Sequence, residues 1–130
     1  MNFEYFNPNP SCNKKRKRWN KCDCSIRAIC GATDLDWVTI YKEICDAGLS
    51  IYDIPGSRDT IDIVLKNHGF EWVKQERGAK KSTVKSFAKN HKNEICVLSC
   101  SGHVLCTKNG NYYDTWDSGD MKVFGWWTKK

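Results

Sequence analysis

The hydrophobic pattern of this 130-residue chain changes its period near residue 70, and this change limits the folds that the chain can adopt. Before that point, apolar side chains recur every three to four residues, which is typical of amphipathic helices. After it, short runs rich in β-branched and aromatic residues alternate with turn residues, which is typical of strands. The sequence therefore predicts a single α+β domain in which helices come first and an antiparallel meander follows.

Four helices are predicted, because each stretch of helical periodicity begins near a capping residue and ends near a glycine or a polar residue. Asp23 and Ser57 are the expected N-caps of the first and third helices, while Gly31 and Gly48 are the expected stops of the first and second. The predicted helices span Cys24–Cys30, Asp34 or Asp36 to Ala47, the residues between Ser57 and Gly69, and Ser82–His91.

Five strands are predicted, and one of the turns between them has a strong local signal. The strands are expected at residues 70–75, 94–100, 103–108, 111–116 and 122–127. The dipeptide Asn109-Gly110 separates the third strand from the fourth and favours a two-residue type I′ turn. With that turn, Lys108 lies opposite Asn111.

Residues 1–20 are rich in Asn, Pro and Lys and show no hydrophobic periodicity, so we expect an extended arm over the surface of a domain at 21–130. The arm holds a basic run that supplies much of the formal net charge of +6. This run is either a solvated arm, which we favour, or a weak nucleic-acid-binding patch. Its members are Lys14, Lys15, Arg16, Lys17 and Arg18.

No apolar run is long enough to span a membrane, and the first residues lack the order of a secretory signal. We therefore expect a cytoplasmic protein without membrane contact. Because the cytosol is reducing, the eight cysteines are expected to be free thiols rather than disulfides.

Cys24 differs from the other cysteines because it lies at a predicted helix start, where unpaired N–H groups and the helix dipole stabilise a thiolate. The dipole alone contributes less than about 1 kcal/mol, so a reactive thiol needs a cationic partner as well. His68 and His91 lie near helix ends, where a structural role explains them. His103 follows Gly102 and opens a strand, so we expect it to be the partner.

The predicted hairpin also brings a carboxylate to His103. Counting from the two-residue turn, His103 lies opposite Trp116 and has Asp114 as its diagonal neighbour, with backbones roughly 7–8 Å apart. A carboxylate at that position reaches an imidazole. A three-residue turn would change the parity and place Asp117 there instead. The turn chemistry favours Asp114, and Asp117 is expected to cap a turn in "DSGD".

Three segments resemble the papain-like cysteine peptidase superfamily. "DCSIRAIC" resembles the segment that opens the central helix with the nucleophile, and "GHV" resembles the start of the histidine-bearing strand. "YYDTW" resembles the strand with the third triad member, where plant and animal members read Asn-Ser-Trp and many bacterial relatives have Asp. The order Cys, His, Asp agrees, and the chain length is closest to compact bacterial and phage-borne members.

The resemblance implies a papain-like fold and a thiol hydrolase that cleaves peptide, isopeptide or amide bonds of a protein or peptide substrate. Cys24, His103 and Asp114 would form its triad, without a cofactor or a metal. Trp116 would shield the hydrogen bond between His103 and Asp114 from water.

One part of the family pattern is different here. The family usually has an oxyanion-stabilising Gln about six residues before the nucleophile, where this sequence has Arg18. The nearest amide is that of Asn20, and the indole N–H of Trp19 is another candidate donor.

Two alternatives remain open. Cys22 and Cys24, with Cys12 and Cys30 nearby, are also compatible with a zinc site in a non-enzymatic module that binds nucleic acid through the basic run. The second alternative keeps the papain-like fold without turnover, as a protein that binds a partner.

Overall fold

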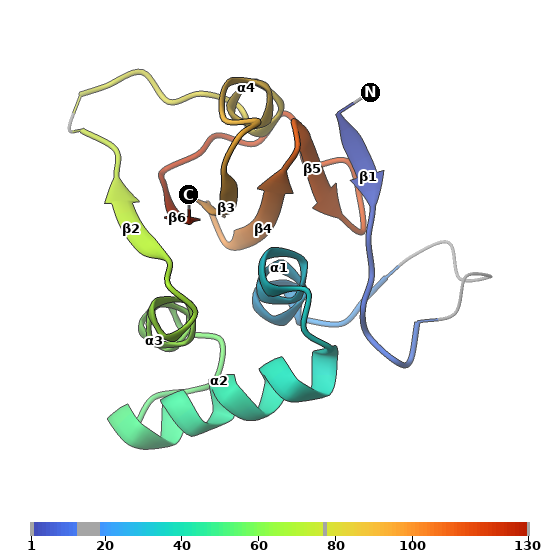
Figure 1. Cartoon of the computed structure of the whole chain (residues 1–130), viewed down its shortest axis with the longest axis vertical. Helices are drawn as coiled ribbons and strands as arrows, with labels where there is room; N and C mark the ends of the chain where they lie inside the picture. Colours follow the sequence, from blue (N-terminus) through green and yellow to red (C-terminus); the bar gives the residue numbers. More distant parts are fainter. Residues whose placement is uncertain (1, 13–18, 77, 130) are drawn as a thin grey trace.

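A mixed β-sheet forms the centre of the molecule, with helices on both of its faces (Figure 1). In the computed structural model, which describes residues 2–12, 19–76 and 78–129, the sheet has six strands in the order β1-β5-β4-β3-β6-β2. The strands are β1 (Phe3–Tyr5), β2 (Glu71–Lys74), β3 (Ile95–Cys100), β4 (His103–Lys108), β5 (Asn111–Asp114) and β6 (Gly125–Lys129). The helices are α1 (Cys24–Thr33), α2 (Trp37–Ile51), α3 (Arg58–Asn67) and α4 (Val84–Asn90). The predicted α+β class is confirmed.

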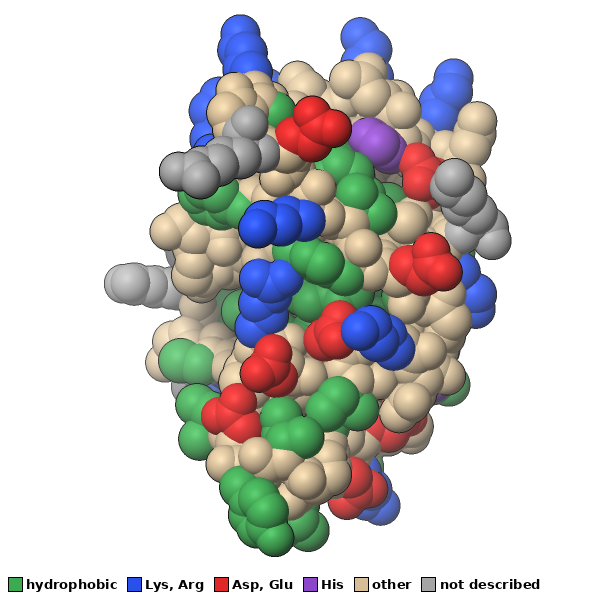
Figure 2. Space-filling model, turned by 90° about the vertical axis from the view of Figure 1, so that its left-hand side faces the viewer, with side chains coloured by type: hydrophobic (Ala, Val, Ile, Leu, Met, Phe, Trp, Pro, Cys, Tyr) green, Lys and Arg blue, Asp and Glu red, His purple; other side chains and the backbone are tan. Residues whose placement is uncertain are grey.

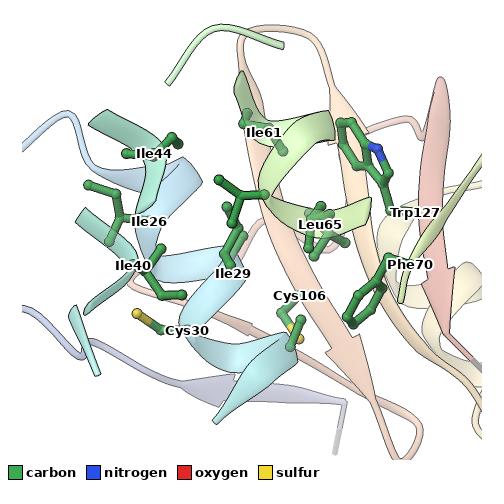
Figure 3. Packing of buried hydrophobic residues seen from close by; sticks show 14 of the residues in the cluster. Ile26, Ile29, Cys30, Ile40, Ile44, Ile61, Leu65, Phe70, Cys106 and Trp127 are labelled. Atoms are coloured by element: carbon green, nitrogen blue, oxygen red, sulfur yellow. The ribbon is translucent and has the colours of Figure 1, made fainter. Parts of the chain in front are cut away.

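The two faces of the sheet bury separate hydrophobic clusters. Helices α1, α2 and α3 cover one face, where Ile29 and Leu65 share a cluster with Trp127 (Figure 3). Helix α4 covers the other face, where Phe87 packs against Trp126 with ring centroids 4.8 Å apart. Neighbouring residues of a strand point to opposite faces, so Trp126 and Trp127 of β6 contribute to one cluster each.

The hairpin between β4 and β5 has the predicted register. Lys108 pairs with Asn111, and the turn residues Asn109 and Gly110 have φ of 56° and 82°. Positive φ at both central positions is the type I′ geometry that Asn-Gly favours. The local turn signal therefore correctly predicted which residues of β4 and β5 lie opposite each other.

The sheet is mixed rather than antiparallel throughout, which corrects the sequence prediction. Strand β1 lies within the segment that was expected to be an arm, and it pairs in parallel with β5, with Phe3 opposite Tyr112. The pairing continues into Phe6, whose N–H donates to the Asp114 carbonyl at 2.9 Å. A three-residue strand has too few positions to show an alternating pattern, and its partner lies more than a hundred residues away in sequence.

Gly31 does not stop α1, in contrast to the prediction. The helix continues to Thr33, and its last turn ends at Asp34, which has a left-handed φ of 61°. Gly31 instead allows a close approach, since a Cβ at this position would lie 3.1 Å from Cβ of Cys106 on β4. The glycine therefore allows α1 to pack closely on the sheet.

Gly48 does not stop α2 either. The helix continues to Ile51, and Tyr52 adopts the left-handed conformation at its end. A Cβ at Gly48 would lie 2.7 Å from the Asp53 carbonyl oxygen. The chain turns back against the helix at Gly48 and leaves no room for a side chain.

Three other elements differ from their predicted bounds by two residues or more. Helix α4 begins at Val84 rather than Ser82, with Thr83 as its N-cap, β5 ends at Asp114 rather than Trp116, and β6 begins at Gly125 rather than Lys122. The N-cap of α3 is Ser57, as predicted. No helix within the described residues is long and apolar enough to cross a membrane.

Replacing Gly31 by Val is expected to destabilise the protein by about 1–3 kcal/mol, because the new side chain overlaps Cys106 in a closely packed interface. Urea unfolding measures this loss. As a control, Lys42→Val introduces the same side chain on the exposed surface of α2 and should change the free energy of unfolding by no more than about 0.5 kcal/mol. Equal losses in the two variants would show that α1 and β4 are not in tight contact.

Candidate active site

Helix α1 lies against β4 (Figure 1). Cys24 is the first residue of α1, His103 is the first residue of β4, and their side chains interact. The Cys24 thiol forms a side-chain hydrogen bond with the His103 imidazole. The thiol is half-buried, and the His103 side chain is 10% exposed. The structure therefore brings together the cysteine and the histidine that the sequence analysis paired.

Asp114 completes the group. Its Oδ2 lies 2.6 Å from Nε2 of His103, which leaves Nδ1 of the ring for Cys24. The Ser118 hydroxyl donates to the same Oδ2 at 2.7 Å, and the Thr115 N–H donates to Oδ1 at 2.8 Å. The sequence analysis did not identify Ser118, because it lies in an irregular loop with no pattern.

Asp117, the alternative third member, is bound elsewhere. Its carboxylate accepts hydrogen bonds from the Tyr112 hydroxyl and the Gly119 N–H, and these contacts lower its pKa. It holds the turn after β5, which is the role expected for it.

Trp116 is 48% exposed, and its ring lies 5.2 Å from the His103 ring, centroid to centroid. It therefore partly covers the imidazole.

The early end of β5 explains how a backbone donor reaches the thiol. The paired ladder between β4 and β5 stops at Cys106 and Tyr113, so Val104 and Thr115 do not pair. The Thr115 N–H turns to the Asp114 side chain, and the Val104 backbone group hydrogen-bonds the Cys24 sulfur instead.

Arg27 connects the triad to a second buried carboxylate. Its guanidinium is 3.6 Å from Asp114 and also forms an ion pair with Asp23, the residue just before α1. All three side chains are at least 93% buried. Buried charges of this kind persist only when they are paired, so Arg27 has a structural role between the two carboxylates.

Asp23 does not cap α1 with its side chain, which corrects the prediction. Its carboxylate instead accepts hydrogen bonds from Asn9, Trp19 and Trp37, at 2.9, 3.0 and 3.0 Å, in addition to Arg27. Burial opposes the charged form, but these donors and the Arg27 charge lower the pKa of Asp23.

The surroundings of Cys24 and His103 favour a charged pair. Burial opposes both ions, but the Asp114 and Cys24 partners raise the pKa of His103 to about 9. For Cys24, burial is outweighed by hydrogen bonds from His103 and Val104 and by the charges of His103 and Arg27, so the pKa of its thiol is lowered. Both shifts therefore favour the thiolate–imidazolium form of this pair over the neutral form.

Four other cysteines have the opposite environment. Burial raises the pKa of Cys96 to about 11 and those of Cys30, Cys100 and Cys106 to about 12. These thiols stay protonated and behave as small apolar side chains. Within the described residues, no three His, Cys, Asp or Glu side chains are grouped so that they could hold a metal ion.

The other two histidines lie at helix ends, and each contacts a glutamate. His68, at the end of α3, lies 2.7 Å from Glu43. His91, at the end of α4, lies 2.7 Å from Glu94. Both contacts fit the structural roles that were expected for them.

Two hollows that share Cys24, Ser25 and Gly56 in their linings form a groove beside the thiol. One half, a cleft of about 300 Å³, is bounded by Cys24, His103, Arg58 and Trp127. The other half, of about 450 Å³, is bounded by apolar groups of α2 and the loop after it, including Tyr41 and Ile54. Cys24 therefore borders both halves.

The apolar half adjoins an exposed hydrophobic surface. Figure 2 shows hydrophobic side chains gathered at the lower end of the molecule, where Figure 1 places the C-terminal end of α2. Ile54 belongs to both the groove and this surface. The exposed members there are Leu49, Ile51, Tyr52 and Ile54.

The two candidate oxyanion donors from sequence do not reach the thiol. The Trp19 indole N–H is occupied by Asp23, and Asn20 is exposed and lines neither half of the groove. The Cys24 N–H, at the first turn of α1, has no intrahelical acceptor and is the available donor. Arg18 and the rest of the basic run, Lys14 to Lys17, lie outside the described residues.

Comparison of the chain with protein-family models, curated proteins and solved structures found no match. The chemistry of the site therefore has to follow from its own geometry.

Arg27→Met is expected to lower the free energy of unfolding by about 3–5 kcal/mol, because it leaves Asp23 and Asp114 buried without a counter-charge. Chemical denaturation measures this loss. Lys85→Met removes an ion pair with Asp120 that lies in solvent, and little change is expected there. A small effect in Arg27→Met would mean that the two carboxylates are solvated rather than buried.

Cys24 is expected to react with iodoacetamide at pH 6 about tenfold faster, or more, than N-acetylcysteine does, because an ordinary thiol is almost fully protonated there. Because the pKa of the Cys24 thiol is lowered, its thiolate persists to a lower pH than that of an ordinary cysteine. The His103 imidazolium is lost as the pH rises through about 9. Mass spectrometry of the peptides locates the label. His103→Ala should remove the advantage at pH 6, and retention of it would rule out the pairing.

Proposed function

We propose that the protein is a thiol hydrolase of peptide, isopeptide or amide bonds, with a papain-like arrangement of Cys24, His103 and Asp114. The single observation that carries this proposal is the continuous contact from thiol to imidazole to carboxylate at an open groove. A nucleophile, a base that contacts it and a group that orients the base are the components of covalent acyl transfer.

The steps follow from the contacts. The Cys24 thiolate attacks the substrate carbonyl, and the His103 imidazolium gives its proton to the leaving nitrogen, so that an acyl-thioester and a free amine are formed. Water then attacks the thioester while His103 accepts one of its protons. The carboxylic acid leaves, and the Cys24 thiolate and the His103 imidazolium are regenerated. Asp114 keeps Nε2 of the imidazole in place, so that Nδ1 exchanges the proton in both steps.

The arrangement of secondary structure also supports a papain-like interpretation. The nucleophile begins a helix that packs on the sheet, the histidine begins a strand, and the carboxylate follows on the next strand. The order and the structural setting agree with the three resembling segments. The Cys24 N–H at the helix start is the donor proposed for the oxyanion.

The substrate groove suits an extended chain. Cys24 lines both halves, so a polypeptide can occupy both with its scissile carbonyl at the thiol. A substrate side chain bound in the apolar half would exclude water from one side of the reacting group, which strengthens the electrostatic contacts in the site.

Asp114→Asn is expected to lower turnover by about tenfold or more, because it removes the charge that keeps His103 protonated beside the thiolate. The assay is the appearance of new amino termini in a diverse peptide mixture, quantified by mass spectrometry. Asp117→Asn makes the same chemical change in a residue that does not contact His103, so it should retain most of the activity.

Cys24→Ala should abolish all cleavage in the same assay. Equal losses in the two aspartate variants would mean that Asp114 has no special role. Rapid alkylation of Cys24 without any cleavage by the wild-type protein would overturn the hydrolase proposal and favour a catalytically silent binding protein.

A further inference from the structure

The cleft beside the triad contains a cationic side chain that the proposed mechanism does not use. Arg58, the first residue of α3, lines the same 300 Å³ cleft as Cys24 and His103. No aspartate or glutamate is among the described residues that line this cleft. When His103 is protonated, the charged side chains that line this cleft are therefore cations, apart from the Cys24 thiolate.

The guanidinium of Arg58 is held on an aromatic platform. Its Cζ lies 3.9 Å from the centre of the Trp72 ring and 5.9 Å from that of Trp127. The two indoles lie 4.6 Å apart, and Trp127 donates to Asp62 at 2.9 Å. The platform is therefore itself fixed by packing and by a hydrogen bond.

Gly125 makes room for this platform. A Cβ at Gly125 would lie 2.4 Å from the Trp72 ring, so any larger residue would displace the indole that supports the guanidinium. The position of Arg58 thus follows from the packing of β6 and β2 rather than from an ion pair.

Stacking occupies the face of a guanidinium and leaves its in-plane N–H groups available. Among the described residues, no carboxylate forms an ion pair with Arg58. Asp62, one turn later on α3, is paired with Lys66 at 2.9 Å. The planar donors of Arg58 match the geometry of a carboxylate, which they can bind through two parallel hydrogen bonds.

We propose that Arg58 determines specificity by binding the carboxylate of an aspartate or glutamate side chain of the substrate, one or two residues from the bond that Cys24 attacks. This inference rests on the proposed hydrolase function. The small volume shared by Arg58 and the thiol limits the distance between the bound carboxylate and the reacting carbonyl. The other, apolar half of the groove has no comparable charge among its described lining residues.

Matched peptidyl acyloxymethyl ketones test the proposal, because they alkylate an activated thiol at the methylene carbon, with loss of the carboxylate, and need no known substrate. Each pair carries Glu or Gln at one of the two residues next to the ketone. The rate at which each probe labels Cys24 is measured by intact-protein mass spectrometry and normalised to the rate with iodoacetamide. The wild-type protein should label about tenfold faster with the Glu member of one pair.

Arg58→Gln should reduce this Glu-to-Gln ratio to about one, a loss of about tenfold. Lys89→Gln removes the same charge from α4 on the opposite face of the sheet and should leave the ratio unchanged. A wild-type protein without a preference for Glu in either pair would overturn the inference, and so would a preference that survives in Arg58→Gln.

The two proposals fail in different ways in this experiment. If Cys24 reacts equally with both members of every pair, the specificity assigned to Arg58 is wrong and the hydrolase proposal stands. If neither member of any pair labels Cys24, the hydrolase proposal fails and the specificity inference fails with it.

Discussion

A row of buried side chains with alternating charge, from Asp23 through Arg27, Asp114 and His103 to Cys24, determines the geometry of the site. Each member contacts the next, with 3.6 Å between Arg27 and Asp114 and 2.6 Å between Asp114 and His103. A buried charge is costly unless a partner of opposite sign lies beside it. The position of each group is therefore determined by its neighbours, and of the five groups Cys24 and His103 line the groove.

The same row of side chains also connects separate segments of the fold. At its inner end, Asp23 binds Asn9 and the indoles of Trp19 and Trp37, so the segment before α1 and the start of α2 are both anchored to the residue next to Cys24. In the middle of the row, Asp114 comes from the last position of β5. Tertiary contacts between segments far apart in sequence thus build a site that no single element contains.

The parts of the site that depend on neighbouring residues were predictable. Asn109-Gly110 specifies its own turn, and the register that follows puts Asp114 rather than Asp117 beside the histidine. The predictions were wrong where a residue far away in sequence determines the role. Gly31 has the local features of a helix stop, but its role is set by the close approach of Cys106. Asp23 has the local features of an N-cap, but its carboxylate accepts hydrogen bonds from three other segments.

Arg58 is another residue whose surroundings could not be predicted from the sequence. In sequence it is an ordinary charged residue at a helix start, and nothing beside it marks a binding role. The features behind its proposed role appear only when β2 and β6 place Trp72 and Trp127 under its guanidinium and the start of α3 reaches the cleft. The charge that lines this cleft is thus a property of the folded chain rather than of a motif.

The buried row of charges is difficult to explain as a device for stability. Replacing buried ion pairs by apolar side chains of similar volume is often neutral or stabilising, so packing alone would be served as well by an apolar interface between α1 and β5. What an apolar interface cannot do is raise the pKa of an imidazole to about 9 beside a thiol. Asp114 does so directly, and Arg27 lies 3.6 Å from Asp114 on the other side and holds it in place. The cost of burying these charges is therefore best understood through its effect at Cys24, where the lowered pKa favours the thiolate form beside the groove.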